Sequence, residues 1–258
     1  MINESTLEGN NQWNTHFHQD LIAHGLNLVA VFDLNSLSSA ILSQIEMELA
    51  GANLEATNYQ RLVLLGNAGT QLWTSLIQSS AGPTNYLADD NPVDQYSSHI
   101  ATRFIHNHLG NAATHILYPG NTYVSLIQLG ELAGWSHSSP LGQGIHPTYG
   151  LWFAYRVLFV TEAELPIASV QHSESPCITC VDKPCISTCL AKAIHPDDAF
   201  NIPACYGHRL AENSSCVDRC LARLACPIGA EHRYALAQIQ HHYGVALRTA
   251  KQYDFISS

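Results

Sequence analysis

The residues with the most evident chemistry are eight cysteines near the C-terminal end of the chain. The sequence contains no others, and the first of them stands at position 177. Four lie within residues 177–189 and four within residues 205–226. Thiols at such spacing bind soft metals or iron–sulfur clusters, whereas in an oxidising compartment they pair as disulfides. The eight are Cys177, Cys180, Cys185, Cys189, Cys205, Cys216, Cys220 and Cys226.

The spacing favours iron–sulfur clusters over zinc. The first set reads C-x2-C-x4-C-x3-C, similar to the bacterial ferredoxin run in which the fourth cysteine binds the other cluster. The second set ends in Cys226-Pro227, as such runs do. Structural zinc prefers two separated C-x2-C pairs, and only one such pair is present. Eight thiols supply two four-ligand clusters with none left over, so we predict two [4Fe-4S] clusters.

The order of the cysteines resembles the dicluster module of the epoxyqueuosine reductases. That module has a tight four-cysteine run, then a lone cysteine, then three that end in Cys-Pro. This chain departs from the pattern at Leu190, where the family has proline, and in two longer gaps before Cys185 and Cys226. Carried over by position, the resemblance implies one cluster on Cys177, Cys180, Cys185 and Cys226, and another on Cys189, Cys205, Cys216 and Cys220.

A second resemblance lies upstream, in the stretch GIHPTYGLWFAYRVLFV at residues 144–160. It is similar to the HP-x-x-G-x-WFA-x-R segment of cobalamin-processing proteins of the CblC type, whose nitroreductase-like α/β fold holds a corrinoid. Residues 91–96, NPVDQY, resemble a helix opening in the same proteins. Epoxyqueuosine reductases join a related corrinoid-binding domain to a dicluster module, in the order seen here. The resemblance therefore implies a corrinoid such as cobalamin as the favoured cofactor, with flavin mononucleotide less favoured.

We interpret residues 149–161 as a strand, so side chains alternate between its two faces. Gly150 and Ala154 would leave room for a flat macrocycle, and Arg156 would bind a propionamide, a phosphate or a substrate anion. The alternative is an aromatic-rich buried strand with Arg156 in an internal ion pair and a hydrogen-bonded loop histidine before Pro147. The predicted cofactor-binding residues are Tyr149, Trp152, Arg156 and His146.

Weaker candidates stand further upstream. GNAG at 66–69, between a strand and a helix, offers backbone N–H groups to a phosphate but also suits an ordinary turn. Asp94 in a first helical turn suits acid–base chemistry, although the helix dipole alone favours an aspartate there. His106 and His108 are two residues apart on a predicted helix, so their side chains diverge and should not form a metal pair.

The elements that position these residues alternate between strands and helices. Apolar strands are predicted at 26–34, 61–66 and 149–161, with Ser36 capping a helix after the first and Pro92 opening another. The pattern predicts an α/β (α+β) fold. We expect a nitroreductase-like, CblC-like domain over residues 1–168 and a small ferredoxin-like dicluster module over residues 169–258, closed by a helix that is weakened by Gly244.

Composition narrows the partners. The chain has 11 basic and 21 acidic residues, a formal net charge of −10, and no Lys/Arg run, so we expect no nucleic-acid partner. Its apolar runs are too short to span a membrane. The N-terminus lacks the order of a secretory signal. We therefore expect a cytoplasmic protein with reduced thiols, whose acidic balance suits a basic electron donor.

Together these features predict an oxidoreductase, an iron–sulfur-dependent reductase. Electrons from an electron-donor protein or a small-molecule reductant would pass through the two clusters to a cofactor in the N-terminal domain. Two alternatives stay open. One is a non-catalytic ferredoxin-type electron carrier or corrinoid-handling protein, and the other is a structural zinc-binding interaction protein.

Overall fold

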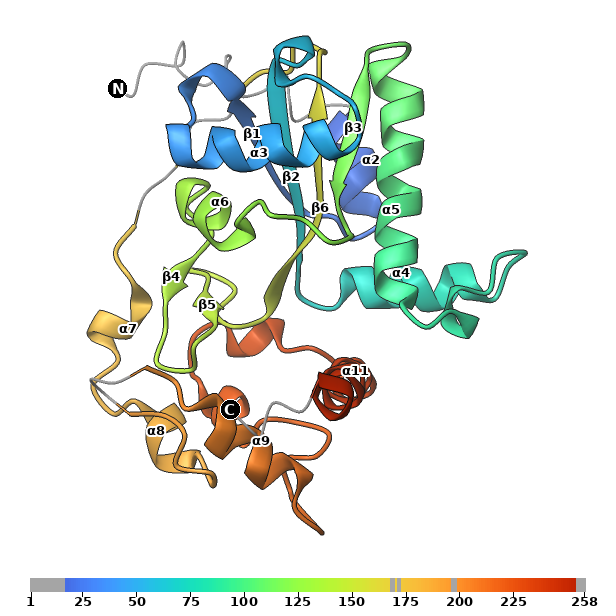
Figure 1. Ribbon diagram of the computed structural model, residues 1–258. Coiled ribbons are helices and arrows are strands. Elements are labelled where there is room, and N and C mark those ends of the chain that lie inside the picture. The colour runs from blue at the N-terminus through green and yellow to red at the C-terminus, as the bar shows by residue number, and fades with distance from the viewer. Residues whose placement is uncertain (1–16, 168–169, 171–172, 196–198, 254–258) are drawn as a thin grey trace, which may run out of the picture. The chain divides into compact units, whose positions relative to one another are not determined.

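The computed structural model describes residues 17–167, 170, 173–195 and 199–253 (Figure 1). The chain divides into two compact units. The N-terminal unit comprises Met1–Ala133 and Ala154–Gln171, and the cysteine unit comprises Gly134–Phe153 and His172–Ser258. The predicted domain boundary between residues 168 and 169 falls outside the described residues. It stays a prediction, but the chain packs residues 134–153 with the cysteines rather than with their sequence neighbours.

The N-terminal unit is built on a four-stranded sheet with the order β1-β2-β6-β3. β1 and β2 are antiparallel with Leu28 opposite Gly66, and β3 and β6 are antiparallel with Thr114 opposite Thr161. The strands span Leu28–Asp33 (β1), Arg61–Ala68 (β2), Thr114–Tyr118 (β3) and Phe153–Thr161 (β6). The predicted strands at 26–34 and 61–66 are therefore present.

Apolar side chains on both faces of the sheet are buried, because successive strand residues point to opposite sides. Val63 and Phe159 join a core with residues of α2, α4 and α5. On the other face Leu62 and Leu64 are fully buried, and α3 crosses the sheet in Figure 1. The helices of this unit span Phe17–Ala23 (α2), Ser39–Gly51 (α3), Gln71–Ser80 (α4), Pro92–Phe104 (α5) and Leu126–Leu132 (α6).

Two helix starts differ in how well the sequence predicted them. Pro92 opens α5 as expected, since its fixed φ suits a first turn. The cap of α3 is Ser38, whose Oγ accepts a hydrogen bond from the Ile41 N–H at 3.4 Å, so the prediction of Ser36 is wrong. Ser36 instead ends a short 3-10 turn that postpones the helix. After α5, a π-helical turn at Ile105–Leu109 carries the two histidines.

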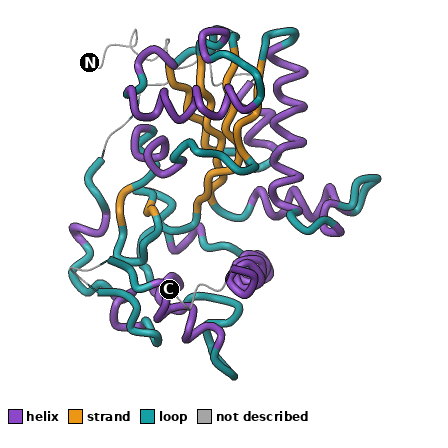
Figure 2. Tube along the Cα trace, in the orientation of Figure 1, coloured by secondary structure: helices purple, strands orange, loops and turns teal. Residues whose placement is uncertain are grey.

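The cysteine unit consists of a two-stranded hairpin, short helices joined by loops, and one long helix (Figure 2). Its elements span His137–Ser138 (β4), Gly144–Ile145 (β5), Pro176–Thr179 (α7), Pro184–Thr188 (α8), Ile202–Leu210 (α9), Leu221–Ala225 (α10) and Leu236–Tyr253 (α11). The last of these continues through Gly244 without a break.

The predicted strand over 149–161 is too long at its N-terminal end. β6 begins at Phe153, and residues 149–152 form a turn in which Gly150 has a φ of +58°. Their alternating assignment to two faces is therefore wrong, because the aromatic content of this stretch predicts burial but not an extended backbone. The α/β fold class itself is confirmed. No helix in the described part of the chain is long and apolar enough to cross a membrane.

Gly25 tests the turn that links α2 to β1. Its φ is +87°, and a Cβ there would lie 2.3 Å from the Cα and N atoms of Leu72. Gly25→Ala should therefore destabilise the protein by roughly 3 kcal/mol, through backbone strain and overlap with backbone that cannot move away.

Chemical denaturation followed by circular dichroism measures this loss. Gly51→Ala is the matched control, since a Cβ at Gly51 meets nothing within 4 Å and its φ is ordinary. It should be neutral or stabilising by up to about 1 kcal/mol. Equal stability of the two variants would contradict the assignment.

Candidate metal centres

Two short helices place four of the cysteines at their ends. Cys185 lies in the first turn of α8 and Cys189 caps its C-terminus. Cys220 caps the N-terminus of α10 and Cys226 its C-terminus. The two helices pack against each other. Because each is only about one turn long, its two cysteines face opposite ends of the pair.

The eight thiols fall into two groups by their electrostatic influence on one another. Burial raises the pKa of Cys185, and charge on Cys226, Cys177 and Cys180 raises it further. In the same way burial raises the pKa of Cys205 to about 11, with added contributions from Cys220, Cys189 and Cys216. The first group is Cys177, Cys180, Cys185 and Cys226, and the second is Cys189, Cys205, Cys216 and Cys220. The structure thus brings together the two groups of four cysteines that the resemblance implies. Because Cys185 at the start of α8 shares a group with Cys226 at the end of α10, the two helices run antiparallel.

The first group lines a small apolar cavity. The four thiols share it with side chains from the hairpin that precedes the cysteine-rich segment, notably Leu141 and Ile145. These two residues and Leu151 form one buried cluster with Cys185 and Cys226. The hairpin of residues 134–153 therefore covers this thiol group, which explains why that segment belongs to the cysteine unit.

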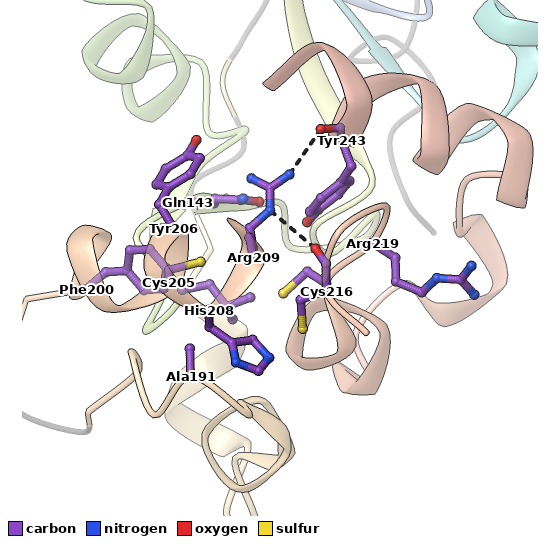
Figure 3. Close-up of a pocket in the computed structure, with 12 residues that line it drawn as sticks. Gln143, Ala191, Phe200, Cys205, Tyr206, His208, Arg209, Cys216, Arg219 and Tyr243 are labelled. Carbon is purple, nitrogen blue, oxygen red and sulfur yellow. Dashed lines mark hydrogen bonds between the residues drawn. The ribbon is translucent and has the colours of Figure 1, made fainter. Parts of the chain in front are cut away.

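The second group borders a larger cavity, drawn in Figure 3. Cys205, Cys216 and Cys220 line it with the aromatic residues Tyr206 and Tyr243. Backbone N–H groups point at sulfur here. The Ala193 N–H lies 3.4 Å from Cys189 Sγ, and the Arg223 N–H lies 3.4 Å from Cys220 Sγ. Such donors stabilise thiolate over thiol and are one of the factors that tune iron–sulfur centres.

The donors of both groups are all thiols, the ligands that hold iron–sulfur clusters. Among the described residues, no three His, Cys, Asp or Glu side chains converge closely enough to hold one metal ion. A zinc site requires all its thiolates at about 2.3 Å from one centre. In a [4Fe-4S] cluster each thiolate binds a different iron, so the sulfurs stand farther apart. The raised thiol pKa values also fit, since a bound cation removes the cost of a buried thiolate.

The predicted cofactor residues of the turn lie within the cysteine unit and contact one another there. His146 Nδ1 accepts the N–H groups of Thr148 and Tyr149, at 3.0 and 3.2 Å. Its pKa is lowered to about 4, first by burial and then by His137 and His232. His146 is therefore neutral and hydrogen-bonded to its own turn, and its predicted contact with a cofactor stays a prediction.

Trp152 is fully buried in the same unit. The guanidinium carbon of Arg223 lies 4.5 Å from the centroid of its ring, and the ring of Tyr234 lies 5.5 Å away. Arg223 also donates to the Leu151 carbonyl. The indole thus packs against a cation and a phenol of its own unit.

Gly150 serves close backbone packing, which corrects its predicted role of leaving room for a macrocycle. A Cβ there would lie 1.9 Å from the carbonyl oxygen of Ile228. Gly229 makes the reciprocal approach, since its Cβ would lie 2.4 Å from the Tyr149 carbonyl carbon. The two glycines let the turn meet the chain directly after Cys226-Pro227. Together they hold the end of the first thiol group.

Arg156 is separated from those residues by the division of the chain, since it lies in the N-terminal unit. It is buried, and its Nε donates to Asn67 Oδ1 at 2.6 Å. Burial raises the pKa of Asp94, and the Arg156 charge opposes part of that rise. Burial likewise raises the pKa of Tyr118, with Asp94 adding to it. The GNAG stretch, Asp94 and Arg156, predicted separately, therefore contribute to one polar cluster.

Within this cluster one buried donor is available to a ligand. Asn67 is fully buried, and its Nδ2 has no hydrogen-bond partner among the described residues. Gly66 to Ala68 belong to β2 rather than to a free loop. The N-terminal unit thus presents the Asn67 amide and the Arg156 guanidinium, which both suit an amide or phosphate oxygen.

Sequence reasoning missed the residues that surround the thiols. Arg209 follows Cys205 by four positions on α9, a spacing that puts both side chains on one helical face. That periodicity was available in the sequence. The roles of Leu141, Ile145 and Tyr243 could not be read from the sequence. Leu141 and Ile145 are distant in the chain from the cysteines that they contact, and loops separate Tyr243 from its cysteines.

The fold is that of the epoxyqueuosine reductases. The enzyme from Bacillus subtilis, solved with its catalytic loop swung out of the active site, matches with a TM-score of 0.52 at 12% identity, covering 87% of this chain and 67% of that one. An epoxyqueuosine reductase solved with a tRNA-Tyr epoxyqueuosine-modified stem loop matches with a TM-score of 0.50 at 11% identity, covering 89% and 68%. This chain thus spans about two thirds of their length.

A Caenorhabditis elegans B12-trafficking protein, CblC, is matched with a TM-score of 0.46 at 11% identity, covering 95% of this chain and 93% of that one. No protein-family model and no curated protein sequence matches the chain. At identities this low the likeness to the reductases shows the fold alone, and at that level the predicted resemblance to epoxyqueuosine reductases is confirmed.

Asp94 gives the polar cluster a pH signature. Because burial raises its pKa, the folded protein binds this proton more tightly than the unfolded chain does. Stability is therefore lost as pH rises from the unfolded pKa of about 3.9 through the raised folded value. Asp94→Asn should stabilise the protein at neutral pH, by less than about 1 kcal/mol because water screens a partly exposed carboxyl.

Thermal melts between pH 4 and pH 8 measure the effect. The gain should shrink as pH falls toward 4, where about half of the unfolded carboxyls are also protonated. Asp90→Asn, at an exposed position in the preceding loop, is the control and should show no such pH-dependent gain. A stability difference for Asp94→Asn that does not change with pH would sink the interpretation.

Proposed function

We propose that this protein is an iron–sulfur reductase. Two [4Fe-4S] clusters in the cysteine unit, one on each thiol group, pass electrons to a cofactor in the N-terminal unit, with a corrinoid favoured over flavin mononucleotide. The single observation that carries the proposal is the division of eight thiols into two groups of four, at opposite ends of one helix pair. When bound, the clusters supply one-electron transfer at potentials tuned by their surroundings.

The chain's own residues support this role by excluding water and holding charge. The hairpin of residues 134–153 buries Cys185 and Cys226 under apolar side chains. Backbone N–H groups donate to the sulfurs of Cys189 and Cys220. In the N-terminal unit, Arg156 and Asn67 offer donors to a cofactor amide or to a substrate anion.

A second candidate is a ferredoxin-type electron carrier without a catalytic cofactor. It is favoured by the surroundings of His146, Tyr149 and Trp152, whose ring contacts are with residues of the cysteine unit. On that hypothesis the turn serves only to cover the first thiol group. A corrinoid-handling role remains a variant of the leading proposal, and a structural zinc role stays the further alternative. We keep the expectation that nucleic acid is not a partner as a prediction.

Anaerobic purification with iron and sulfide counted per chain tests the leading proposal. We expect about eight of each, from two four-iron clusters. Zinc, or neither metal, in oxygen-free protein would overturn it.

Single-ligand variants test the two groups. Cys185→Ser should remove or convert the cluster of the first group and leave the second, so that iron falls to roughly half. Cys205→Ser is the matched counterpart and should affect the other cluster. The readout is iron content together with electron paramagnetic resonance of the reduced protein. Equal loss of both clusters in each variant would contradict the partition.

A ligand titration separates the reductase from the carrier. Cobalamin and flavin mononucleotide are added separately to the iron-loaded protein, and binding is followed by calorimetry. We expect cobalamin to bind, and Arg156→Gln to weaken it roughly 10- to 100-fold, as expected for loss of one charge-assisted hydrogen bond.

Arg103→Gln is the control in the same unit, because Arg103 forms a half-exposed ion pair with Asp20. It should leave the affinity unchanged. Binding of neither ligand would favour the carrier, whereas tight binding of the flavin alone would replace the corrinoid in the proposal.

A further inference from the structure

Arg209 is a cation buried beside the second thiol group. Only 6% of its surface is exposed. It lines the same cavity as Cys205, Cys216 and Cys220, and Figure 3 shows its guanidinium between Cys216 and Tyr243. It shares a helical face with Cys205, one turn earlier on α9. The charge is therefore held near three of the four sulfurs of that group.

The guanidinium is held in one orientation. Its Nε donates to the Cys216 carbonyl at 3.3 Å and its Nη2 to the Tyr243 carbonyl at 3.0 Å. The rings of Tyr206 and Tyr243 lie 5.1 and 4.9 Å from its central carbon. These contacts involve backbone and aromatic groups, so the full positive charge remains available to act on its surroundings.

In the described part of the chain no carboxylate pairs with Arg209, unlike Arg61, Arg103 and Arg219, which face aspartates. A buried charge without a counter-ion is costly, so buried charges are paired in stable proteins. The groups in its cavity that become negative as metal ligands are the thiols of Cys205, Cys216 and Cys220. On the proposed function, thiolates that hold a cluster would supply the negative partner that Arg209 lacks.

Resting on the proposed function, we infer that Arg209 raises the reduction potential of the second cluster above that of the first. Each cluster takes up one electron from a one-electron donor, and this electron makes the centre more negative. A fixed buried cation stabilises the reduced form, because Coulomb attraction is strong where water is excluded. Among the described residues, the cations that act on the first group are half-buried Lys183 and exposed Arg233, whose charges water screens. Electrons therefore move from the first cluster to the second.

A redox titration of the full-length, anaerobically purified protein tests this inference. Dithionite reduction is followed by electron paramagnetic resonance, which reports the midpoint of each cluster. In Arg209→Gln the reduced form of the second cluster should become at least tenfold less favoured at a given potential. For a one-electron couple this is a fall of about 59 mV in one midpoint, with the other unchanged.

Two variants make the test specific. Arg209→Lys keeps the charge and should retain most of the wild-type midpoint, which covers the case in which Arg209→Gln fails to fold. Arg219→Gln is the matched control, because Arg219 borders the same cavity but is half-exposed and paired with Asp218 at 2.7 Å. It should shift the midpoint much less.

The possible failures are distinguishable. Protein without iron and sulfide would overturn the proposed function. Protein with both clusters intact, but with the same midpoints in wild type, Arg209→Gln and Arg219→Gln, would overturn the role of Arg209 alone. So would a shift of equal size in both clusters, or a Lys variant that behaves like the Gln variant.

Discussion

The antiparallel packing of α8 and α10 is the constraint on which the cysteine unit depends. Two helices of five residues cannot bury a core of their own, and each carries one thiol of each group at its ends. The four remaining cysteines complete the groups from α7 and its C-cap, from α9 and from the loop before α10. One thiol of each group at the ends of each helix holds the two thiol groups about one short helix apart.

The rest of the unit covers the two thiol groups. The glycines at 150 and 229 allow backbone to meet backbone, and this contact fixes residues 134–153 over the first group. The aromatic turn that resembles a corrinoid segment is thus part of the cover. Arg209 and the tyrosines beside it cover the second group, where a positive charge lies among the apolar contacts. The two thiol groups therefore differ in electrostatic environment although they consist of the same residue type.

Charge is divided unevenly between the units. The N-terminal unit has 13 acidic and three basic residues, whereas the cysteine unit has eight of each. The acidic balance of the chain thus belongs wholly to the N-terminal unit. A basic electron donor attracted by that charge would be steered toward the N-terminal unit. The cysteine unit is neutral overall, and it exposes the apolar side chains of Ile178 and Val181 near the first thiol group. Docking at the cysteine unit would rest on apolar contact rather than on net charge.

By itself the sequence determined the elements whose signals are local. Apolar runs predicted β1 and β2, a proline predicted the start of α5, and the resemblance to the dicluster module implied the two groups of four thiols. Local patterns led to wrong predictions in two places. Both Ser36 and Ser38 suit a helix cap, and only Ser38 forms it. Residues 149–152 are aromatic-rich like a buried strand, but they form a turn. Only the tertiary structure decided what surrounds each thiol, that Asn67, Asp94 and Arg156 contribute to one cluster, and that Arg209 lacks a carboxylate partner among the described residues. These properties arise from contacts between residues distant in the chain, and the spacing of neighbouring residues does not predict such contacts.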